Sequence, residues 1–241
     1  MASTSNFRQA LREARNEAIL GPNVIANALP YVGGGLILTA LGTFGGLNIA
    51  ATNPGLFMTT FWVAIIAQLV LFFVASGVAN NGNNKVALPL LATYSLLTGY
   101  TLTGLVALAL GTSGVGIAGI GVAALGCGIT FIGARSIGSN LSEADGMALS
   151  KTINLGIIAL VVVILAQFVL SFFGIIAPSW LEIGISGLGV LLFVGSAVVD
   201  FYLLPRAYDD RQYLSAALSM YLTYINLFIF ILRLLIAINR D

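Results

Sequence analysis

The chain has 241 residues, of which 59% are hydrophobic and only 8% are charged, and its net charge at neutral pH is +1. Soluble domains carry roughly a quarter charged residues, so this composition excludes a soluble globule and makes lipid the solvent for most of the surface. The small net charge also excludes an extended basic surface for nucleic acid.

Two residue counts exclude most site chemistry. The chain has no histidine, which excludes histidine-based catalytic triads, imidazole metal ligands and haem held by histidine. It has one cysteine, Cys127, so neither an intramolecular disulfide nor a thiolate metal cluster can form. We therefore expect no conventional enzyme, no cofactor and no resident metal.

The N-terminal arm, residues 1–27, precedes the first long apolar run. It has no apolar core and no cleavage site of the kind found in signal peptides. Phe7, Leu11, Ala14 and Ala18 lie at helical spacing with arginines between them. This pattern predicts a short helix lying at the membrane interface.

Apolar runs long enough to cross about 30 Å of hydrocarbon follow the arm. Their predicted bounds are Ala28–Leu47, Phe57–Ala79, Val86–Leu110, Gly114–Ala134, Asn154–Ile176, Leu181–Leu204 and Tyr213–Ile238. The connections are short and no linker separates two units, so residues 28–241 are predicted to form a single all-α membrane domain of seven spans.

The cations outside the spans predict the orientation. They gather in the arm and in every second connection, at Arg8, Arg12, Arg15, Lys85, Arg135, Lys151, Arg206 and Arg211. By the positive-inside rule the arm is cytoplasmic, and an odd number of spans places the C-terminus outside. Arg240 alone argues for the opposite orientation.

Glycine is concentrated in the fourth predicted span. Gly114, Gly116 and Gly119 match the spacing of a dinucleotide fingerprint, but no strand precedes them, so nucleotide binding is not expected. The glycines that follow, through Gly138, lie at spacings that let membrane helices approach closely. We expect this helix to pack tightly against a neighbour.

Only two charged residues lie inside the spans. Asp200 is near the predicted cytoplasmic end of the sixth span, where it either marks a functional path or is an interfacial carboxylate solvated from the headgroups. Arg233 is expected to extend to the headgroups, with Glu182 on the same side of the membrane. An aspartyl intramembrane protease needs two buried aspartates and is therefore excluded.

Three hydroxyls share one face of the third span, because Tyr94, Thr98 and Thr101 recur at helical spacing. They either form hydrogen bonds between helices or line a hydrated path. Asp209 and Asp210 lie in a mixed-charge turn after the sixth span, where solvation by water is the default interpretation.

The last span carries a family resemblance. Its run from Tyr221 to Leu235, YLTYINLFIFILRLL, resembles the closing helix of the transmembrane Bax inhibitor motif family. Two further segments agree in order, namely TYSLLTGYTL from Thr93 to Leu102 and the region around Asp200. The resemblance covers the chain after about residue 25.

The resemblance implies six helices around a central seventh and, for characterised members, a pH-sensitive calcium leak. In such members an aspartate in the sixth helix hydrogen-bonds an aspartate in the seventh and controls the closed state. Asp200 matches the first aspartate, but Thr223 occupies the position of the second, and the second span lacks the arginine that usually accompanies them. Either Thr223 donates to an ionised Asp200, or Asp200 stays protonated.

Two functions remain open. The first is a slow cation leak, with calcium as a candidate ion, in which Asp200 and Thr223 form the gate and Thr98 and Thr101 line the path. Asp209 and Asp210 would then contact ions at the cytoplasmic mouth, as a weak site. The second is a protein that does not transport but binds other membrane proteins or a membrane protease in assembly or quality control. Its candidate surfaces are the arm and the glycine-rich fourth span, and the resemblance places the chain in a bacterial plasma membrane or an internal membrane.

Overall fold

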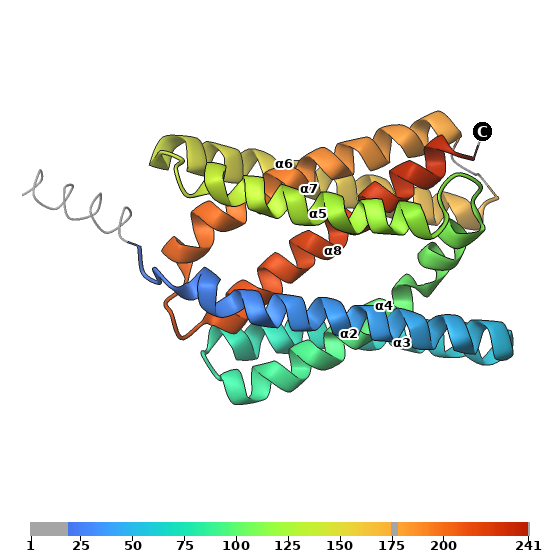
Figure 1. The fold of residues 1–241 in the computed structure, drawn as a ribbon, viewed down its shortest axis with the longest axis horizontal. Coiled ribbons are helices and arrows are strands. Elements are labelled where there is room, and N and C mark those ends of the chain that lie inside the picture. The colour runs from blue at the N-terminus through green and yellow to red at the C-terminus, as the bar shows by residue number, and fades with distance from the viewer. Residues whose placement is uncertain (1–18, 175–177, 241) are drawn as a thin grey trace, which may run out of the picture.

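The computed structural model describes residues 19–174 and 178–240. Within them lie seven helices, each long and apolar enough to cross a membrane. Their bounds are α2 Val24–Thr52, α3 Pro54–Asn80, α4 Asn84–Gly111, α5 Gly116–Gly138, α6 Glu143–Phe172, α7 Ser179–Ala207 and α8 Tyr213–Ile238 (Figure 1). The prediction of an all-α protein with seven spans is confirmed. The interfacial helix expected in the arm lies outside the described residues.

Helix α6 begins at Glu143, well before the predicted start at Asn154. Ser142 caps this end, since its Oγ accepts the backbone N–H of Asp145 at 3.2 Å. The acidic side chains of Glu143 and Asp145 in the first turn also interact favourably with the positive end of the helix dipole. The prediction was wrong at this boundary because it followed hydrophobicity, and the first turns of α6 are polar.

Helix α8 lies at the centre of the bundle. It crosses obliquely between α2, α3 and α4 on one side and α5 and α7 on the other (Figure 1). Five of the six surrounding helices contact it directly, whereas α6 packs mainly against α7. The large side chains of Met220, Tyr221, Leu227 and Leu232 on α8 are completely buried.

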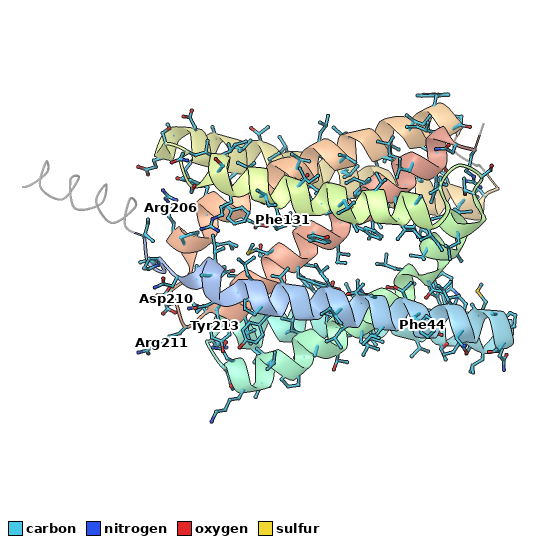
Figure 2. The ribbon with its side chains drawn as sticks, viewed as in Figure 1. Phe44, Phe131, Arg206, Asp210, Arg211 and Tyr213 are labelled. Atoms are coloured by element: carbon cyan, nitrogen blue, oxygen red, sulfur yellow. The ribbon has the colours of Figure 1, made fainter. Side chains whose placement is uncertain are left out.

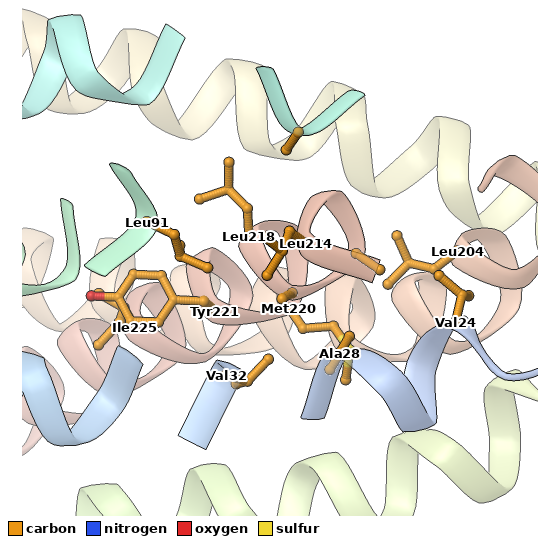
Figure 3. Packing of buried hydrophobic residues seen from close by; sticks show 14 of the residues in the cluster. Val24, Ala28, Val32, Leu91, Leu204, Leu214, Leu218, Met220, Tyr221 and Ile225 are labelled. Atoms are coloured by element: carbon orange, nitrogen blue, oxygen red, sulfur yellow. The ribbon is translucent and has the colours of Figure 1, made fainter. Parts of the chain in front are cut away.

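The largest core cluster joins α8 to α2 and α4. Figure 3 shows Val32 and Ala28 of α2 facing Met220 of α8, with Leu91 of α4 above Tyr221. Lipid tails are as apolar as these side chains, so the gain from their burial comes from close packing and dispersion rather than from removal of water.

Glycines bring α2 and α4 into direct backbone contact. A Cβ placed on Gly99 of α4 would lie 1.9 Å from the carbonyl oxygen of Thr39, and one on Gly42 of α2 would lie 2.1 Å from that of Leu96. Each distance is far below van der Waals contact. Only glycine fits at these two positions.

The expectation of tight packing through the glycines of α5 holds for some of these glycines and fails for others. A Cβ on Gly121, Gly128 or Gly133 would meet nothing within 4 Å, so these glycines lie on an open face. Gly138 and Gly126 do face neighbours, because a Cβ on Gly138 would lie 2.3 Å from the carbonyl oxygen of Val198 and one on Gly126 would lie 3.4 Å from the side chain of Ile231. Contact between α5 and α8 also includes Cys127, which is completely buried with its Sγ 3.8 Å from the carbonyl oxygen of Tyr224.

One end of the bundle carries most of the cations and is called the basic end below. It lies at the left of Figure 1, where α2 begins and where α7 is joined to α8. Its basic residues are Lys85, Arg135, Lys151, Arg206 and Arg211. The positive-inside rule predicts that this end faces the cytoplasm.

Candidate functional site

Asp200 is a buried carboxylate between α7 and α8, with 6% of its surface exposed. Its Oδ1 accepts a hydrogen bond from Ser219 Oγ at 2.9 Å, and its Oδ2 accepts one from Thr223 Oγ1 at 2.7 Å. The structure therefore brings together the two residues that the sequence analysis paired as a gate. Each carboxylate oxygen has one hydroxyl donor.

The helical repeat positions both sets of side chains. Ser219 and Thr223 are four residues apart on α8, and Ser196 and Asp200 are four residues apart on α7, so each pair shares a helix face. The hydroxyls of Ser196 and Thr223 lie 3.3 Å apart and close the group. At a rise of about 1.5 Å per residue, Asp200 lies about 10 Å inside the end of α7.

No cation neutralises Asp200 within the described part of the chain. The one ion pair in that part joins Arg240 to Glu182 at 4.0 Å, at the end of the bundle opposite the basic end. An ionised carboxylate in the interior of a membrane protein is costly and marks a functional position. Among the residues that the structure describes, the two hydroxyl donors are its only direct polar partners.

A cavity of about 190 Å³ lies beside Asp200, between α3 and α8 at the basic end. Ser219 lines this cavity and also donates to Asp200. The other polar side chains of its wall are Ser76, Asn80, Tyr208 and Ser215. Ser215 is buried and its Oγ has no hydrogen-bond partner in the residues described, so the wall has unused capacity to bind water.

Tyr208 follows α7 and faces the same cavity. Burial, and secondarily the negative charge of Asp200, raise the pKa of its phenol above the ordinary value. Tyr208 therefore stays protonated and neutral throughout the physiological pH range. A pH response at this end of the bundle cannot arise from this group.

Thr98 and Thr101 do not join Asp200. Gln68 of α3 donates from Nε2 to Thr98 Oγ1 at 3.0 Å, and Thr101 Oγ1 donates to Gln68 Oε1 at 2.9 Å. Between the two interpretations of this hydroxyl face, the geometry favours hydrogen bonds between helices. The amide of Gln68 on α3 thus forms hydrogen bonds with two hydroxyls of α4.

Replacing Gln68 with leucine removes both of these hydrogen bonds. Side-chain hydrogen bonds between membrane helices are worth about 0.6 kcal/mol each, so we expect a loss of about 1 kcal/mol in the free energy of unfolding. Denaturation in detergent micelles measures the change. Gln167→Leu on α6 is the matched control, and an equal loss in that variant would contradict the role assigned to Gln68.

A second buried cluster of hydroxyl side chains lies between α2, α4 and α8. Thr39 Oγ1 and the Tyr221 hydroxyl are 2.6 Å apart, and Thr39 Oγ1 is also 3.0 Å from the carbonyl oxygen of Ser95. The ring of Tyr221 meets that of Tyr94 at 6.1 Å in an edge-on arrangement. Polar contacts thus occur on both faces of the central helix.

Comparison with known proteins decides the family. The family described as "Inhibitor of apoptosis-promoting Bax1" matches residues 21–241, which include all seven described helices. The chain belongs to the Bax inhibitor family. This membership confirms the resemblance seen in the last span.

Its relatives within the Bax inhibitor family include bacterial and animal proteins. An uncharacterized membrane protein of Streptococcus pyogenes serotype M6 is 33% identical over 181 residues, covering 72% of this chain and 73% of that protein. Inner membrane protein YbhL of Escherichia coli is 29% identical over 240 residues, covering 92% and 97%. Protein lifeguard 4 of Mus musculus is 37% identical over 60 residues, 25% of each chain.

In this Bax inhibitor family protein, Asp209 and Asp210 accept hydrogen bonds that stabilise the connection between α7 and α8. Asp209 Oδ1 accepts the backbone N–H groups of Arg211 at 2.8 Å and Gln212 at 3.1 Å, just before α8 begins. Asp210 accepts the backbone N–H and the side-chain amide of Asn23 at 2.8 and 3.2 Å. Both carboxylates are engaged in bonds that shape the α7–α8 connection and hold it to α2.

Arg233 and Glu182 do not pair with each other. The Arg233 guanidinium lies 5.9 Å from the centre of the Phe230 ring, and Glu182 lies in the first turn of α7, near Arg240. No group of three metal-binding side chains occurs among residues 19–174 and 178–240. With one carboxylate and two hydroxyls, the Asp200 group provides too few hard ligands to hold calcium tightly.

Several partners of the predicted residues were missed in the sequence. Ser219 and Ser196 carry a readable signal, because each lies four residues from a residue of the predicted gate on the same helix. Gln68 also carries one, as the one amide side chain within the predicted span Phe57–Ala79. The approach of Tyr221 to Thr39 had no such signal, since it depends on how three helices cross.

Proposed function

We propose that this chain is a slow cation leak in which Asp200, held by Ser219 and Thr223, closes the path near the basic end. Calcium is the first ion to test. The proposal rests on one observation: a buried carboxylate, which has no cationic partner among the described residues, lies one hydroxyl away from a polar cavity. A cation entering that cavity would meet Asp200 as its first fixed negative charge inside the bundle.

Beyond Asp200 the helices are packed closed. Phe193 of α7 and Phe230 of α8 stack at 5.5 Å, and Leu227 is completely buried beside them. Transport therefore requires α7 and α8 to separate, which breaks the hydrogen bonds at Asp200. In this proposal the group formed by Asp200, Ser219 and Thr223 is a latch, and protonation of Asp200 changes its strength.

The test measures calcium and potassium flux into liposomes that contain the purified protein, from about pH 5 to about pH 8, for the native chain and for Asp200→Asn. We expect calcium flux in the variant to fall about tenfold, since the asparagine amide can keep a hydrogen bond to each hydroxyl and so retains the latch, whereas the charge–ion attraction of about 1.4 kcal/mol is lost. The remaining flux should no longer depend on pH, because the titratable group of the latch is gone.

Ser186→Ala is the control for this experiment. Ser186 is buried on α7 and has no hydrogen-bond partner within the described chain, so its removal should leave flux unchanged. Protein-free vesicles set the baseline. Native flux equal to that baseline, or equal flux from the native chain and Asp200→Asn, would contradict the leak.

A second candidate is favoured by the outer surface of α5. A Cβ on Gly121, Gly128 or Gly133 would meet nothing within 4 Å, and the large apolar side chains of Leu125 and Ile132 on the same helix are strongly exposed, so this surface can pack against another membrane helix. A role in binding other membrane proteins, or a membrane protease, would use that face. Absence of flux from correctly folded native protein would favour this role over the leak.

A further inference from the structure

A second cavity, of about 290 Å³, lies at the basic end between α2, α5 and α7. It is separate from the cavity beside Ser219, and the two share no lining residue. Two guanidinium groups line it, Arg135 in the last turn of α5 and Arg206 in the last turn of α7. Ser139 adds a hydroxyl to the same wall.

Neither arginine is neutralised by a carboxylate in the described parts of the chain. Arg206 donates from Nη1 to the carbonyl oxygen of Tyr202 at 2.6 Å and lies 4.2 Å from the centre of the Tyr202 ring. These contacts hold the guanidinium in place and leave its charge uncompensated. Asp210, at the same end of the bundle (Figure 2), is bound to Asn23 rather than to either arginine.

The rest of this cavity is apolar. Ile25 and Leu29 of α2 face Phe201 of α7 across it. A free inorganic anion would gain nothing from these side chains. A ligand that fits the whole cavity has an anionic group at one end and a hydrocarbon portion at the other.

Apolar residues also line a cavity farther along α2, toward the other end of the bundle. Helices α2 and α5 make almost no direct contact with each other, and between them lies a larger cavity of about 360 Å³. Its wall includes Phe44 of α2, Ile120 of α5 and Phe228 of α8. The hydroxyls of Thr39 and Thr43 in this wall have backbone carbonyl oxygens of α2 and α4 within hydrogen-bond distance, which leaves the lining suited to hydrocarbon.

We propose that the cavity at Arg135 and Arg206 binds an anionic phospholipid. The phosphate lies between the two guanidinium groups and accepts their N–H donors. The first part of an acyl chain packs on Ile25, Leu29 and Phe201 and continues between α2 and α5. The last turns of α5 and α7 lie at the level of the headgroups, where arginine side chains attract anionic lipid.

The test is native mass spectrometry of delipidated protein mixed with phosphatidylglycerol or with phosphatidylcholine carrying the same acyl chains. The native chain should retain phosphatidylglycerol in preference to phosphatidylcholine. At about fivefold in affinity for each arginine, the double variant Arg135→Gln, Arg206→Gln should bind phosphatidylglycerol about 25-fold more weakly. The single variant Arg135→Gln should lose about fivefold.

Arg211→Gln is the matched control, because Arg211 belongs to the basic end but does not line the cavity. It should bind phosphatidylglycerol as the native chain does. An equal loss in Arg211→Gln would overturn the proposal in favour of general surface charge, and unchanged binding by the double variant would overturn it outright. Arg135→Gln guards against misfolding, since Arg135 makes no contact like that of Arg206 with Tyr202.

A free headgroup distinguishes a seated lipid from a phosphate site. Glycerol phosphate at the same concentration should not displace phosphatidylglycerol, because it lacks the chain that packs on Ile25, Leu29 and Phe201. Displacement by glycerol phosphate would overturn the assignment to lipid.

Discussion

Replacing Gly99 with alanine is expected to lower the free energy of unfolding by about 3 kcal/mol. The new Cβ would lie 1.9 Å from the carbonyl oxygen of Thr39, so α2 and α4 would have to move apart along their contact. The hydrogen bond between Thr43 Oγ1 and the carbonyl oxygen of Gly99, 2.9 Å long, would be strained by the same movement. Unfolding in mixed micelles, followed by circular dichroism, measures the loss.

Gly104→Ala on the same helix is the control for this prediction. A Cβ on Gly104 meets nothing within 4 Å, so we expect its effect to lie within about 0.5 kcal/mol of zero. Equal stabilities for Gly99→Ala and Gly104→Ala would show that the approach of α2 to α4 contributes little.

Thr223→Asp is expected to make cation flux steeply dependent on pH. It places a second carboxylate where the Thr223 hydroxyl now lies 2.7 Å from Asp200 Oδ2, and two carboxylates at that separation share one proton over a range of pH. Flux should then change about tenfold between about pH 5 and about pH 8, as the pair passes from singly to doubly ionised. The variant supplies the second aspartate that the family resemblance implies and this chain lacks.

Thr223→Asn separates the effect of charge from the effect of shape. Asparagine matches aspartate in size but does not titrate, so its flux should vary with pH no more than that of the native chain. Identical pH profiles for Thr223→Asp and Thr223→Asn would remove the carboxylate pair as the source of pH sensing.

Hydrophobicity alone was enough to predict the spans. A segment that crosses the hydrocarbon needs about 20 apolar residues in a helix, because only then are its backbone N–H and C=O groups hydrogen-bonded within the segment. This requirement located all seven helices. It failed for the first turns of α6, where Ser142 caps a polar segment that begins at Glu143. Hydrophobicity indicates where lipid surrounds a helix, whereas capping determines where the helix begins.

Glycine spacing was less informative. The dense glycines of α5 suggested tight packing, yet the closest helix contact uses Gly42 of α2 and Gly99 of α4. Spacing shows that one face of a helix is flat, but it does not show what lies against that face. The neighbour is set by the three-dimensional order of the helices, which glycine spacing does not specify.

The candidate site could be read in part from helical periodicity. Asp200 was identified by its charge inside a span and Thr223 by the family resemblance, and the spacing of four residues from each to Ser196 and Ser219 would have completed the group. Periodicity relates residues only within one helix. The separation of Thr98 from Asp200, and its bond to Gln68, required the packed bundle.

Cys127 allows transient separation of α5 from α8 to be measured in the native chain. It is the one thiol in the sequence, and it is completely buried beside Tyr224 of α8. A maleimide can react with the thiol only while α5 is separated from α8. The rate of modification therefore reports how often the two helices separate and gives the free energy of that opening. Because the buried thiol does not react while the helices stay packed, cysteines introduced elsewhere can be labelled without first replacing Cys127.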